Sequence, residues 1–345
     1  SLLQDFCECL SENSGLNRNI VSANEGNAIG IATGYYLSKG KPAMVYMQNS
    51  GIGNAVNPLV SLADEDVYNI PILLLIGWRG EPNTQDEPQH KKQGKITLEL
   101  LNVLGIETLI LDDDYEQQIQ YCMDYMKKNS KSIALIVRKN TFTPYKNAKV
   151  PEQYSLTREC ALKLITQNLA DTDIIVSSTG KMSRELFEIR ENNNQSHSND
   201  FLTVGSMGHT SSLALGLSLF TDKNIYCIDG DGSFIMHMGA TAVLADNAGD
   251  NLKYIIINNG AHESVGGQPT VGYKICISDI LRGVGIKNIC EAENEEQLIS
   301  GMEFLKSNGM SAMIVYTKQG SRNNLGRPTI TPVENKTMFM ERLKK

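Results

Sequence analysis

Short, continuously apolar runs alternate along the chain with longer segments in which apolar residues recur every three or four positions. In the first part of the chain the apolar runs predict strands at Asn19–Asn24, Ala43–Gln48, Ile70–Ile76, Glu107–Leu111 and Ile133–Arg138. The amphipathic segments predict helices between them, at Gly26–Ser38, Asn54–Ala63, Ile96–Leu104 and Tyr115–Lys127. Because continuous apolar runs are typical of strands covered on both faces, we expect a parallel sheet with crossover helices.

A polar stretch from Lys139 to Ser155 interrupts this alternation and contains Pro144 and Pro151. The alternation then restarts, with strands predicted at Asp173–Ser178, Phe201–Val204, Asn224–Ile228, Leu252–Ile257 and Ser311–Thr317. Helices are predicted at Arg158–Asn168, Ser183–Arg190, Ser212–Leu219, Gly239–Ala248 and Glu296–Lys306. We therefore expect two α/β domains of similar size, residues 1–140 and 156–345, each a mostly parallel sheet covered by helices, joined by a linker at residues 141–155.

Composition and charge narrow the classes of function. The chain has 345 residues, of which 41% are hydrophobic, and a formal net charge of −7. Nucleic-acid-binding proteins usually carry a basic face, so nucleic acid is not expected as a partner. No apolar run reaches the length of a membrane span. The seven cysteines are scattered and odd in number, which is typical of reduced thiols in a cytoplasmic protein.

The polar segment from Gly77 to Lys95 follows a predicted strand and is itself predicted to be a long loop. Long loops in compact domains are uncommon and are often functional. A solvated loop without a function fits this composition equally well.

The segment from Asn224 to Ala261 carries the most specific signal in the chain. A predicted strand leads into Gly230-Asp231-Gly232-Ser233, and a helix and a second strand then lead to Asn258-Asn259. Both strands end at the carboxyl edge of a parallel sheet, where α/β proteins bind ligands. The glycines permit a close approach of the backbone to a phosphate, and the start of the helix offers amide donors. Carboxylate, amide, carbonyl and phosphate oxygens together suit Mg²⁺.

This pairing resembles the signature of thiamine-diphosphate enzymes, because Asn259 follows Asp231 by 28 residues, which is close to the family spacing. Two further motifs extend the resemblance: a glutamate at the start of a helix, Glu25, and the turn Gly205-Ser206-Met207-Gly208. The family has a pyrimidine-binding domain followed by a diphosphate-binding domain. The resemblance assigns these roles to residues 1–140 and 156–345, respectively.

The middle domain of the larger family members has no counterpart here, so the chain resembles the short decarboxylases of phosphonopyruvate and sulfopyruvate. The similarity to the phosphonopyruvate branch runs through both domains, in the motifs Gln48–Pro58, Asp86–His90, Gly205–His209, Asn258–Thr270 and Leu325–Pro328. It implies decarboxylation of phosphonopyruvate, a small anionic 2-keto acid, to phosphonoacetaldehyde and CO₂, in phosphonate biosynthesis of the 2-aminoethylphosphonate type. It also implies self-association, with the active site between subunits. In the family a short stretch precedes the equivalent of Ser1, so we expect the sequence to begin inside a longer chain.

The resemblance further implies roles around the pyrimidine ring of the cofactor. Glu25 would protonate the aminopyrimidine ring, Met207 would hold the cofactor bent, and the carbonyl of Gly205 would accept a hydrogen bond from the amino group. Ordinary structural roles compete with two of these. A glutamate at a helix start interacts favourably with the helix dipole, and Met207 can be a core residue. The downstream motif favours the catalytic role for Glu25.

At the diphosphate end, the resemblance implies that Mg²⁺ is bound by Asp231, Asn259 and the carbonyl oxygen of Ala261, with Asn258 as the alternative ligand. The residues expected to hold the diphosphate are those of two turns after strands: Thr179, Gly180, Gly230, Gly232 and Ser233. A helix cap at Thr179-Gly180 is an equally good interpretation.

Histidines and donors near these motifs are candidates for substrate chemistry. His90, His209 and His262 are predicted in loops or turns, where they can bind an anion or transfer protons near neutral pH. We predict catalytic roles for His90 and His262, a solvated His197, and a structural His237 at the start of a helix. A phosphonate needs hydrogen-bond donors and positive charge. The further candidates for its binding are Ser50, Gly51, Lys181, His209 and Arg327.

Three other functions share parts of this pattern. Sulfopyruvate decarboxylation differs only in the anion that the pocket must pair. Carboligases of this family usually carry the missing middle domain. A regulatory subunit without activity would keep the fold, but intact Glu25, Asp231 and Asn259 argue against a lost cofactor site.

Overall fold

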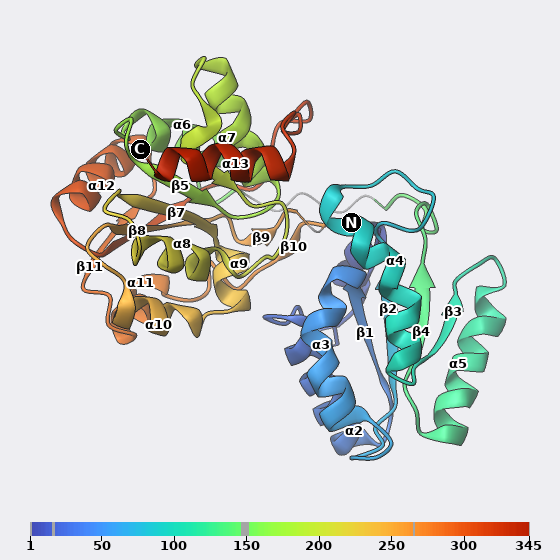
Figure 1. Ribbon diagram of the computed structural model, residues 1–345. Helices are drawn as coiled ribbons and strands as arrows, with labels where there is room; N and C mark the ends of the chain where they lie inside the picture. The colour runs from blue at the N-terminus through green and yellow to red at the C-terminus, as the bar shows by residue number, and fades with distance from the viewer. Residues whose placement is uncertain (1, 16–17, 146–151, 265, 345) are drawn as a thin grey trace. The chain divides into compact units, whose positions relative to one another are not determined.

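Runs of aliphatic residues form a separate parallel sheet in each half of the chain. The computed structural model describes residues 2–15, 18–145, 152–264 and 266–344, and the chain divides into unit 1 (Ser1–Ala148) and unit 2 (Lys149–Lys345) (Figure 1). Of the predicted linker, residues 146–151 lie outside the described residues. No helix in the described part of the chain is long and apolar enough to cross a membrane.

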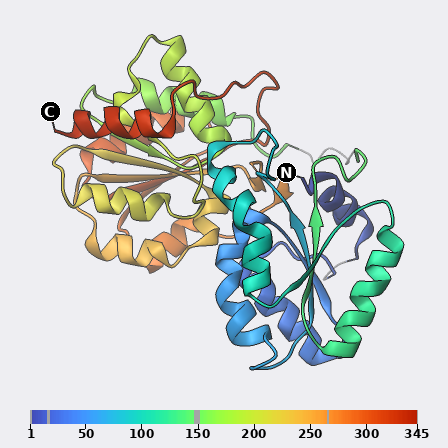
Figure 2. The same cartoon turned by 45° about the vertical axis from the view of Figure 1, so that its right-hand side comes forward.

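Unit 1 contains four parallel strands in the order β1-β2-β4-β3. The strands are β1 (Ala43–Gln48), β2 (Ile72–Gly77), β3 (Glu107–Ile110) and β4 (Ile133–Val137). The helices are α1 (Gln4–Asn13), α2 (Glu25–Lys39), α3 (Ile52–Pro58), α4 (Pro88–Val103) and α5 (Tyr115–Asn129), with a 3₁₀ turn η1 (Asn49–Gly51) and a π turn η2 (Leu59–Ala63). Successive strand residues point to opposite faces. One face packs against α2, α3 and α4 and the other against α1 and α5, so the sheet lies between two helical layers (Figure 2).

Unit 2 contains six parallel strands in the order β11-β12-β8-β7-β5-β6. The strands are β5 (Ile174–Ser177), β6 (Asp200–Leu202), β7 (Ile225–Gly230), β8 (Leu252–Asn258), β11 (Asn288–Ala292) and β12 (Ser311–Tyr316), with a small antiparallel pair β9 (Ala261–His262) and β10 (Gln268–Pro269). The helices are α6 (Arg158–Gln167), α7 (Lys181–Asn192), α8 (Thr210–Ser218), α9 (Asp231–Met236), α10 (Ala240–Asn247), α11 (Ile277–Gly283), α12 (Glu295–Ser307) and α13 (Pro332–Leu343), with a 3₁₀ turn η3 (His197–Asn199).

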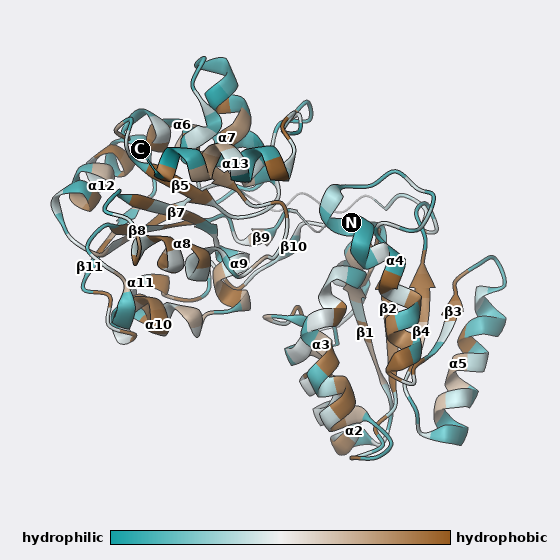
Figure 3. Ribbon diagram, in the orientation of Figure 1, coloured by the Kyte–Doolittle hydropathy of each residue, from teal (hydrophilic) through white to brown (hydrophobic). Residues whose placement is uncertain are grey.

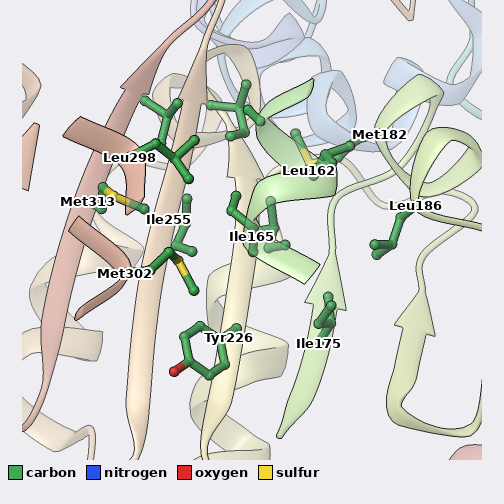
Figure 4. Close-up of a cluster of buried hydrophobic side chains, with 14 of the residues drawn as sticks. Leu162, Ile165, Ile175, Met182, Leu186, Tyr226, Ile255, Leu298, Met302 and Met313 are labelled. Atoms are coloured by element: carbon green, nitrogen blue, oxygen red, sulfur yellow. The ribbon is translucent and has the colours of Figure 1, made fainter. Parts of the chain in front are cut away.

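The sheet of unit 2 is buried on both faces, which explains why its strands are continuously apolar. Ile175 joins the cluster formed with α6, α7 and α12 (Figure 4), whereas its neighbours Ile174 and Val176 join the cluster formed with α8, α10 and α11. Hydrophobic residues accordingly concentrate on the strands and on the inner sides of the helices (Figure 3). This two-sided burial holds the carboxyl ends of β7 and β8 side by side.

The predicted fold class, two parallel α/β domains, is confirmed, and most predicted strands and helices differ from the structure by only one to a few residues at their ends. The strand predicted at Asn19–Asn24 is wrong. There, the Ser22 hydroxyl donates to the carbonyl of Asn24 (2.8 Å), and the Asn24 side chain caps α2 by accepting from the amide of Asn27 (3.0 Å). Such local side-chain bonds compete with strand pairing.

The loop predicted from Gly77 to Lys95 is wrong in its second half, because α4 begins at Pro88. Proline is favoured in the first turn of a helix. The buried positions in its first two turns are His90 and Gly94 rather than aliphatic residues, so no apolar period marks this part of the helix. His237 was predicted at the start of a helix, and this position is wrong, because His237 is the residue that follows the end of α9. The elements that the sequence did not predict are α1, α9, α11, α13, β9, β10 and β11.

Unit 2 contains a buried ion pair that offers a test of its stability. Arg190 donates to both carboxylate oxygens of Asp200, at 2.8 and 2.9 Å, and Asp200 is fully buried. Asp200→Ala leaves the guanidinium buried without its partner, so the free energy of unfolding should fall by about 3–5 kcal/mol. Urea denaturation measures this. Asp279→Ala, which breaks the exposed pair with Arg282 (2.8 Å), is the matched control and should lower the free energy of unfolding far less. Equal losses in the two variants would contradict the prediction.

Candidate active site

The ends of β7 and β8 bring two polar residues to one edge of the sheet in unit 2. β7 ends at Gly230, which is paired with Ile257 of β8, so the residues that follow each strand are neighbours. Asp231 opens α9, and Asn259 follows β8. Both side chains are buried, with 2% and 5% of their surface exposed. Asp231 and Asn259 therefore lie close together at the carboxyl ends of β7 and β8, as the sequence predicted.

The carboxylate of Asp231 is held by neutral donors. The hydroxyl of Thr270 donates to its Oδ2 atom, and the backbone amides of Gly232 and Asn259 also donate to it. Burial raises the pKa of Asp231 to about 6, although these hydrogen bonds oppose the shift. Asp231 forms no ion pair with any residue that the structure describes. A desolvated carboxylate without a positive partner is suited to a cation.

The two asparagines after β8 have different environments. Asn258 is fully buried, donates to the carbonyl of Gly272 (2.8 Å) and accepts from the amide of Gly260 (3.2 Å). Asn259 lines the pocket beside Asp231, and its Oδ1 atom accepts from the amide of Ala261 (3.1 Å). This arrangement favours Asn259 over Asn258 as a ligand.

The donor set fits a hard cation that is completed by a phosphate. Asp231, Asn259 and the carbonyl of Ala261 supply oxygen atoms of the kind that Mg²⁺ prefers. Within the described ranges, no three His, Cys, Asp or Glu side chains form a cluster that could hold a metal ion by themselves. A cation at this edge would therefore depend on oxygens from a bound ligand.

The turn before α8 lies against the start of α9. The amide of Gly208 donates to the Ser233 hydroxyl (2.9 Å), and Met207 lines the same pocket as Asp231. Ser233 in turn donates its hydroxyl proton to the buried carboxylate of Asp229. The side chain of Ser233 is thus used within the protein, and its binding of a diphosphate stays a prediction.

One pocket of unit 2 collects most of the residues that the sequence singled out in this half of the chain. They are Thr179, Met207, Gly230, Asp231, Gly232, Ser233, Asn259, Ala261 and His262. Gly180 lies next to it, with a φ of 93° and Ser264 packed so closely that a Cβ atom would come within 2.0 Å of its Oγ atom. Burial lowers the pKa of His262, which favours the neutral ring.

The pocket also contains residues that the sequence did not reveal. Arg158 lines it while donating to both oxygens of Glu185 (2.7 Å each) and to Glu263 (2.5 Å). Glu263, which also lines the pocket, and Thr270, which donates to Asp231 from outside the lining, lie within the motif Asn258–Thr270; this motif was the available signal for them. Arg158 lies outside every motif, at the start of α6.

Three candidates for anion binding in unit 2 are not among the residues that line this pocket. Lys181 begins α7. His209 precedes α8 and is exposed, with its ring 4.7 Å from that of His237. Arg327 is exposed in the segment after β12, next to Gly326, whose carbonyl accepts from Arg184 (2.6 Å).

In unit 1, Glu25 begins α2 beside the turn that contains Ser50 and Gly51. The Oε2 atom of Glu25 accepts from the side-chain amide of Asn54 (2.8 Å). A Cβ atom on Gly51 would come within 2.2 Å of Oε1, so only glycine leaves room for this carboxyl group. Asn54, which the sequence did not single out by itself, thus fixes the orientation of Glu25.

His90 is buried on α4 within a chain of polar contacts. Its Nδ1 atom lies 2.9 Å from Asp86, and its Nε2 atom lies 3.4 Å from the amide of Gln48, which also donates to Ser50 (2.6 Å). Burial lowers the pKa of His90, although Asp86 opposes the shift. Burial alone would raise the pKa of Asp86, but hydrogen bonds from Arg79 and His90 hold it well below its usual range.

Two domain families match the chain. Residues 1–100 match the thiamine pyrophosphate enzyme N-terminal TPP binding domain, and residues 178–314 match the C-terminal TPP binding domain. Thiamine pyrophosphate is another name for thiamine diphosphate. The second match includes every residue that lines the pocket except Arg158.

Several known proteins are similar to the chain. A phosphonopyruvate decarboxylase of Streptomyces hygroscopicus is 28% identical over 344 residues, which cover 94% of this chain and 84% of that protein. A sulfopyruvate decarboxylase of Methanosarcina acetivorans is also 28% identical over 344 residues, covering 92% and 86%. The sulfopyruvate decarboxylase subunit beta of Methanococcus maripaludis is 31% identical over 190 residues, covering 55% and 99%.

Asp231→Ala should abolish the stabilisation that Mg²⁺ and thiamine diphosphate together give the protein, because the only carboxylate of the predicted cation site is lost. Ligands at about 100 times their dissociation constant stabilise a protein by about 2.7 kcal/mol, enough to raise its melting temperature. Thermal unfolding with and without both ligands measures the difference. Asp246→Ala, which removes an exposed carboxylate of α10, should keep the full effect. A normal shift in the Asp231 variant would exclude this cation site.

Proposed function

The chain belongs to the thiamine-diphosphate-dependent decarboxylases, and from this premise we propose that its substrate is phosphonopyruvate, which it converts to phosphonoacetaldehyde and CO₂. The observation that carries the proposal is the similarity to phosphonopyruvate decarboxylases of two Streptomyces species over 94% and 92% of the chain. The reaction would serve phosphonate biosynthesis, toward products of the 2-aminoethylphosphonate type.

Bound thiamine diphosphate supplies an electron sink for the carbon that loses CO₂. We propose that Asp231, Asn259 and the carbonyl of Ala261 hold Mg²⁺ against the diphosphate. The buried carboxylate of Asp231, which has neutral hydrogen-bond donors and a raised pKa, supports this role. The residues expected to hold the diphosphate itself are those of the two turns: Thr179, Gly180, Gly230, Gly232 and Ser233.

Glu25 would exchange a proton with the aminopyrimidine ring. One of its oxygens accepts from Asn54, which fixes the carboxyl group and leaves the other oxygen beside Gly51. Met207 would keep the cofactor bent, and the carbonyl of Gly205 would accept a hydrogen bond from its amino group. The location of Met207 in the pocket supports its part of this arrangement.

For the substrate, we propose His90 and His262 as the residues that move protons or pair with the anion. His262 lines the pocket, and His90 is oriented by Asp86. Ser50, Gly51, Lys181, His209 and Arg327 are the further candidates for the phosphonate group. We also propose that the chain self-associates with active sites between subunits. The description of similar chains as subunits of sulfopyruvate decarboxylase supports this view.

The second candidate substrate is sulfopyruvate. The sulfopyruvate decarboxylase of Methanosarcina acetivorans matches the chain with the same 28% identity and nearly the same coverage. Sulfonate and phosphonate have similar shapes, but a phosphonate can carry more negative charge, so the two substrates need pockets that differ in the number of positive groups.

Glu25→Gln should bind thiamine diphosphate but lose most of its activity. The amide fills the same space and keeps a contact with Asn54, yet it cannot deliver a proton to the ring. Positioned proton transfer contributes roughly 10²–10⁴-fold, so kcat should fall by that factor. Glu65→Gln, at the exposed pair with Lys131 in the same unit, is the control and should retain activity. Near-normal turnover by the Glu25 variant would show that Glu25 has no catalytic role and only interacts with the dipole of α2.

Purified protein with Mg²⁺ and thiamine diphosphate should show a higher kcat/KM for phosphonopyruvate than for sulfopyruvate or pyruvate. A pocket that pairs a phosphonate leaves buried donors without partners when pyruvate binds, and such sites can discriminate by about 10⁴-fold. Release of CO₂ and of the aldehyde measures the three rates. A preference for sulfopyruvate would replace the proposed substrate and leave the cofactor assignment intact.

A further inference from the structure

The function proposed above gives no role to Asp229, a carboxylate two residues before Asp231. Asp229 has only 1% of its surface exposed. It accepts hydrogen bonds from the hydroxyls of Tyr254 (3.1 Å), Ser178 and Ser233 and from the backbone amide of Gly230 (3.0 Å). Four donors converge on one carboxylate directly beneath the start of α9, so its neighbours have fixed orientations.

The contact with Ser233 has a consequence for the turn before α8. A serine hydroxyl has one proton to donate and lone pairs that can accept. Because the proton of Ser233 points to Asp229, its oxygen is oriented to accept from the amide of Gly208, at 2.9 Å. Asp229 thereby fixes a hydrogen bond in which it takes no direct part.

The turn held by this bond has an unusual backbone. Ser206 has a φ of 59° and Gly208 a φ of 90°, both in the left-handed region. At position 208 a Cβ atom would also come within 2.3 Å of the His237 ring. Glycine adopts such a φ readily, but at Ser206 it persists only where the surroundings determine it. The bond from Gly208 to Ser233 is one such determinant.

Met207 lies between these two residues and lines the pocket. Its Cε atom lies 3.2 Å from the place where a Cβ atom on Gly232 would be, so the side chain packs directly on the start of α9. A small rotation of the turn would move this side chain away from that surface.

We propose that Asp229 is a positioning residue, which acts through Ser233 and the amide of Gly208 to hold Met207 in the place where it bends the cofactor. The proposal rests on the role of Met207 in the proposed function. It does not depend on which keto acid is the substrate, and the experiment below uses none.

The experiment compares Asp229→Asn and Ser233→Ala with the wild-type chain by two measurements. In the protein without ligands, amide hydrogen exchange of the peptide that spans residues 205–209 should become faster in both variants. In the protein with Mg²⁺ and thiamine diphosphate, the exchange of the C2 hydrogen of the bound cofactor should slow by about 10- to 100-fold, because misplacement by about 1 Å has effects of this size. In Asp229→Asn, which leaves every residue proposed to hold the diphosphate in place, the dissociation constant of the cofactor should change far less.

Asp173→Asn is the matched control. Asp173 is also buried, with 4% exposed, but it precedes β5 at the opposite end of the same sheet, where it accepts from Asn224 (3.0 Å) and the amide of Ala170 (2.9 Å). This variant should lose stability and leave both exchange rates unchanged. Met207→Ala should slow the C2 exchange.

Two results would overturn the proposal. If Asp229→Asn and Ser233→Ala lower the melting temperature as Asp173→Asn does, yet leave both exchange rates at the wild-type level, Asp229 only stabilises the fold. If Met207→Ala exchanges the C2 hydrogen at the wild-type rate, Met207 does not bend the cofactor, and Asp229 has nothing to position. Either result leaves the preference among keto acids to be decided by its own assay.

Discussion

Two buried carboxylates at the end of β7, Asp229 and Asp231, set the conditions for the whole carboxyl edge of the sheet in unit 2. Neither forms an ion pair within the described part of the chain, and hydroxyls and backbone amides are their donors. Burying a carboxylate without a positive partner costs several kcal/mol unless hydrogen bonds compensate. Burial raises the pKa of both carboxyl groups, and hydrogen bonds oppose the shift at both. Asp231 lines the pocket and Asp229 does not. A divalent cation in the pocket would therefore supply a compensating charge at Asp231 only.

This requirement explains the course of the chain after β8. The segment beyond β10 returns to the sheet edge so that Thr270 can donate to Asp231. The return is very close: a Cβ atom on Gly272 would lie 2.5 Å from Oδ2 of Asp231 and 2.6 Å from Oδ1 of Asn258. Asn258 anchors the segment by donating to the carbonyl of Gly272, while Asn259 is left to line the pocket. The two adjacent asparagines thus differ in function because one points into the protein and the next into the site.

The sequence could predict those parts of the molecule that follow from strand periodicity. Continuous apolar runs located every strand of the two parallel sheets except β11, and the rule that ligands bind at carboxyl ends placed Asp231 and Asn259 together. It could not predict Thr270, because its contact with Asp231 depends on an irregular segment with no periodicity. It also missed β11, an edge strand in which Glu291 is exposed and only Ala292 is fully buried, so that no apolar run marks it. The first two turns of α4 were missed for the opposite reason, since His90 and Gly94 are buried there without being aliphatic.

The Gly-Asp-Gly-Ser signature is therefore only partly a set of ligands. Of its four residues, Asp231 is the one that presents a charge to the pocket. Gly232 is required by packing as much as by a phosphate, since a Cβ atom would come 2.5 Å from Nδ1 of His262 and 3.2 Å from Cε of Met207. Ser233 directs its hydroxyl toward Asp229 and the Gly208 amide, which lie within the protein. The spacing of the signature is fixed because the short helix α9 has two tasks. Its Ser233 donates to the buried carboxylate of Asp229, and its first residue, Asp231, directs a second carboxylate to the pocket. A Gly-Asp-Gly-Ser turn can follow many strands. Here a second buried aspartate, Asp229, comes immediately before it, so the charges of the site and the backbone geometry of the turn depend on each other.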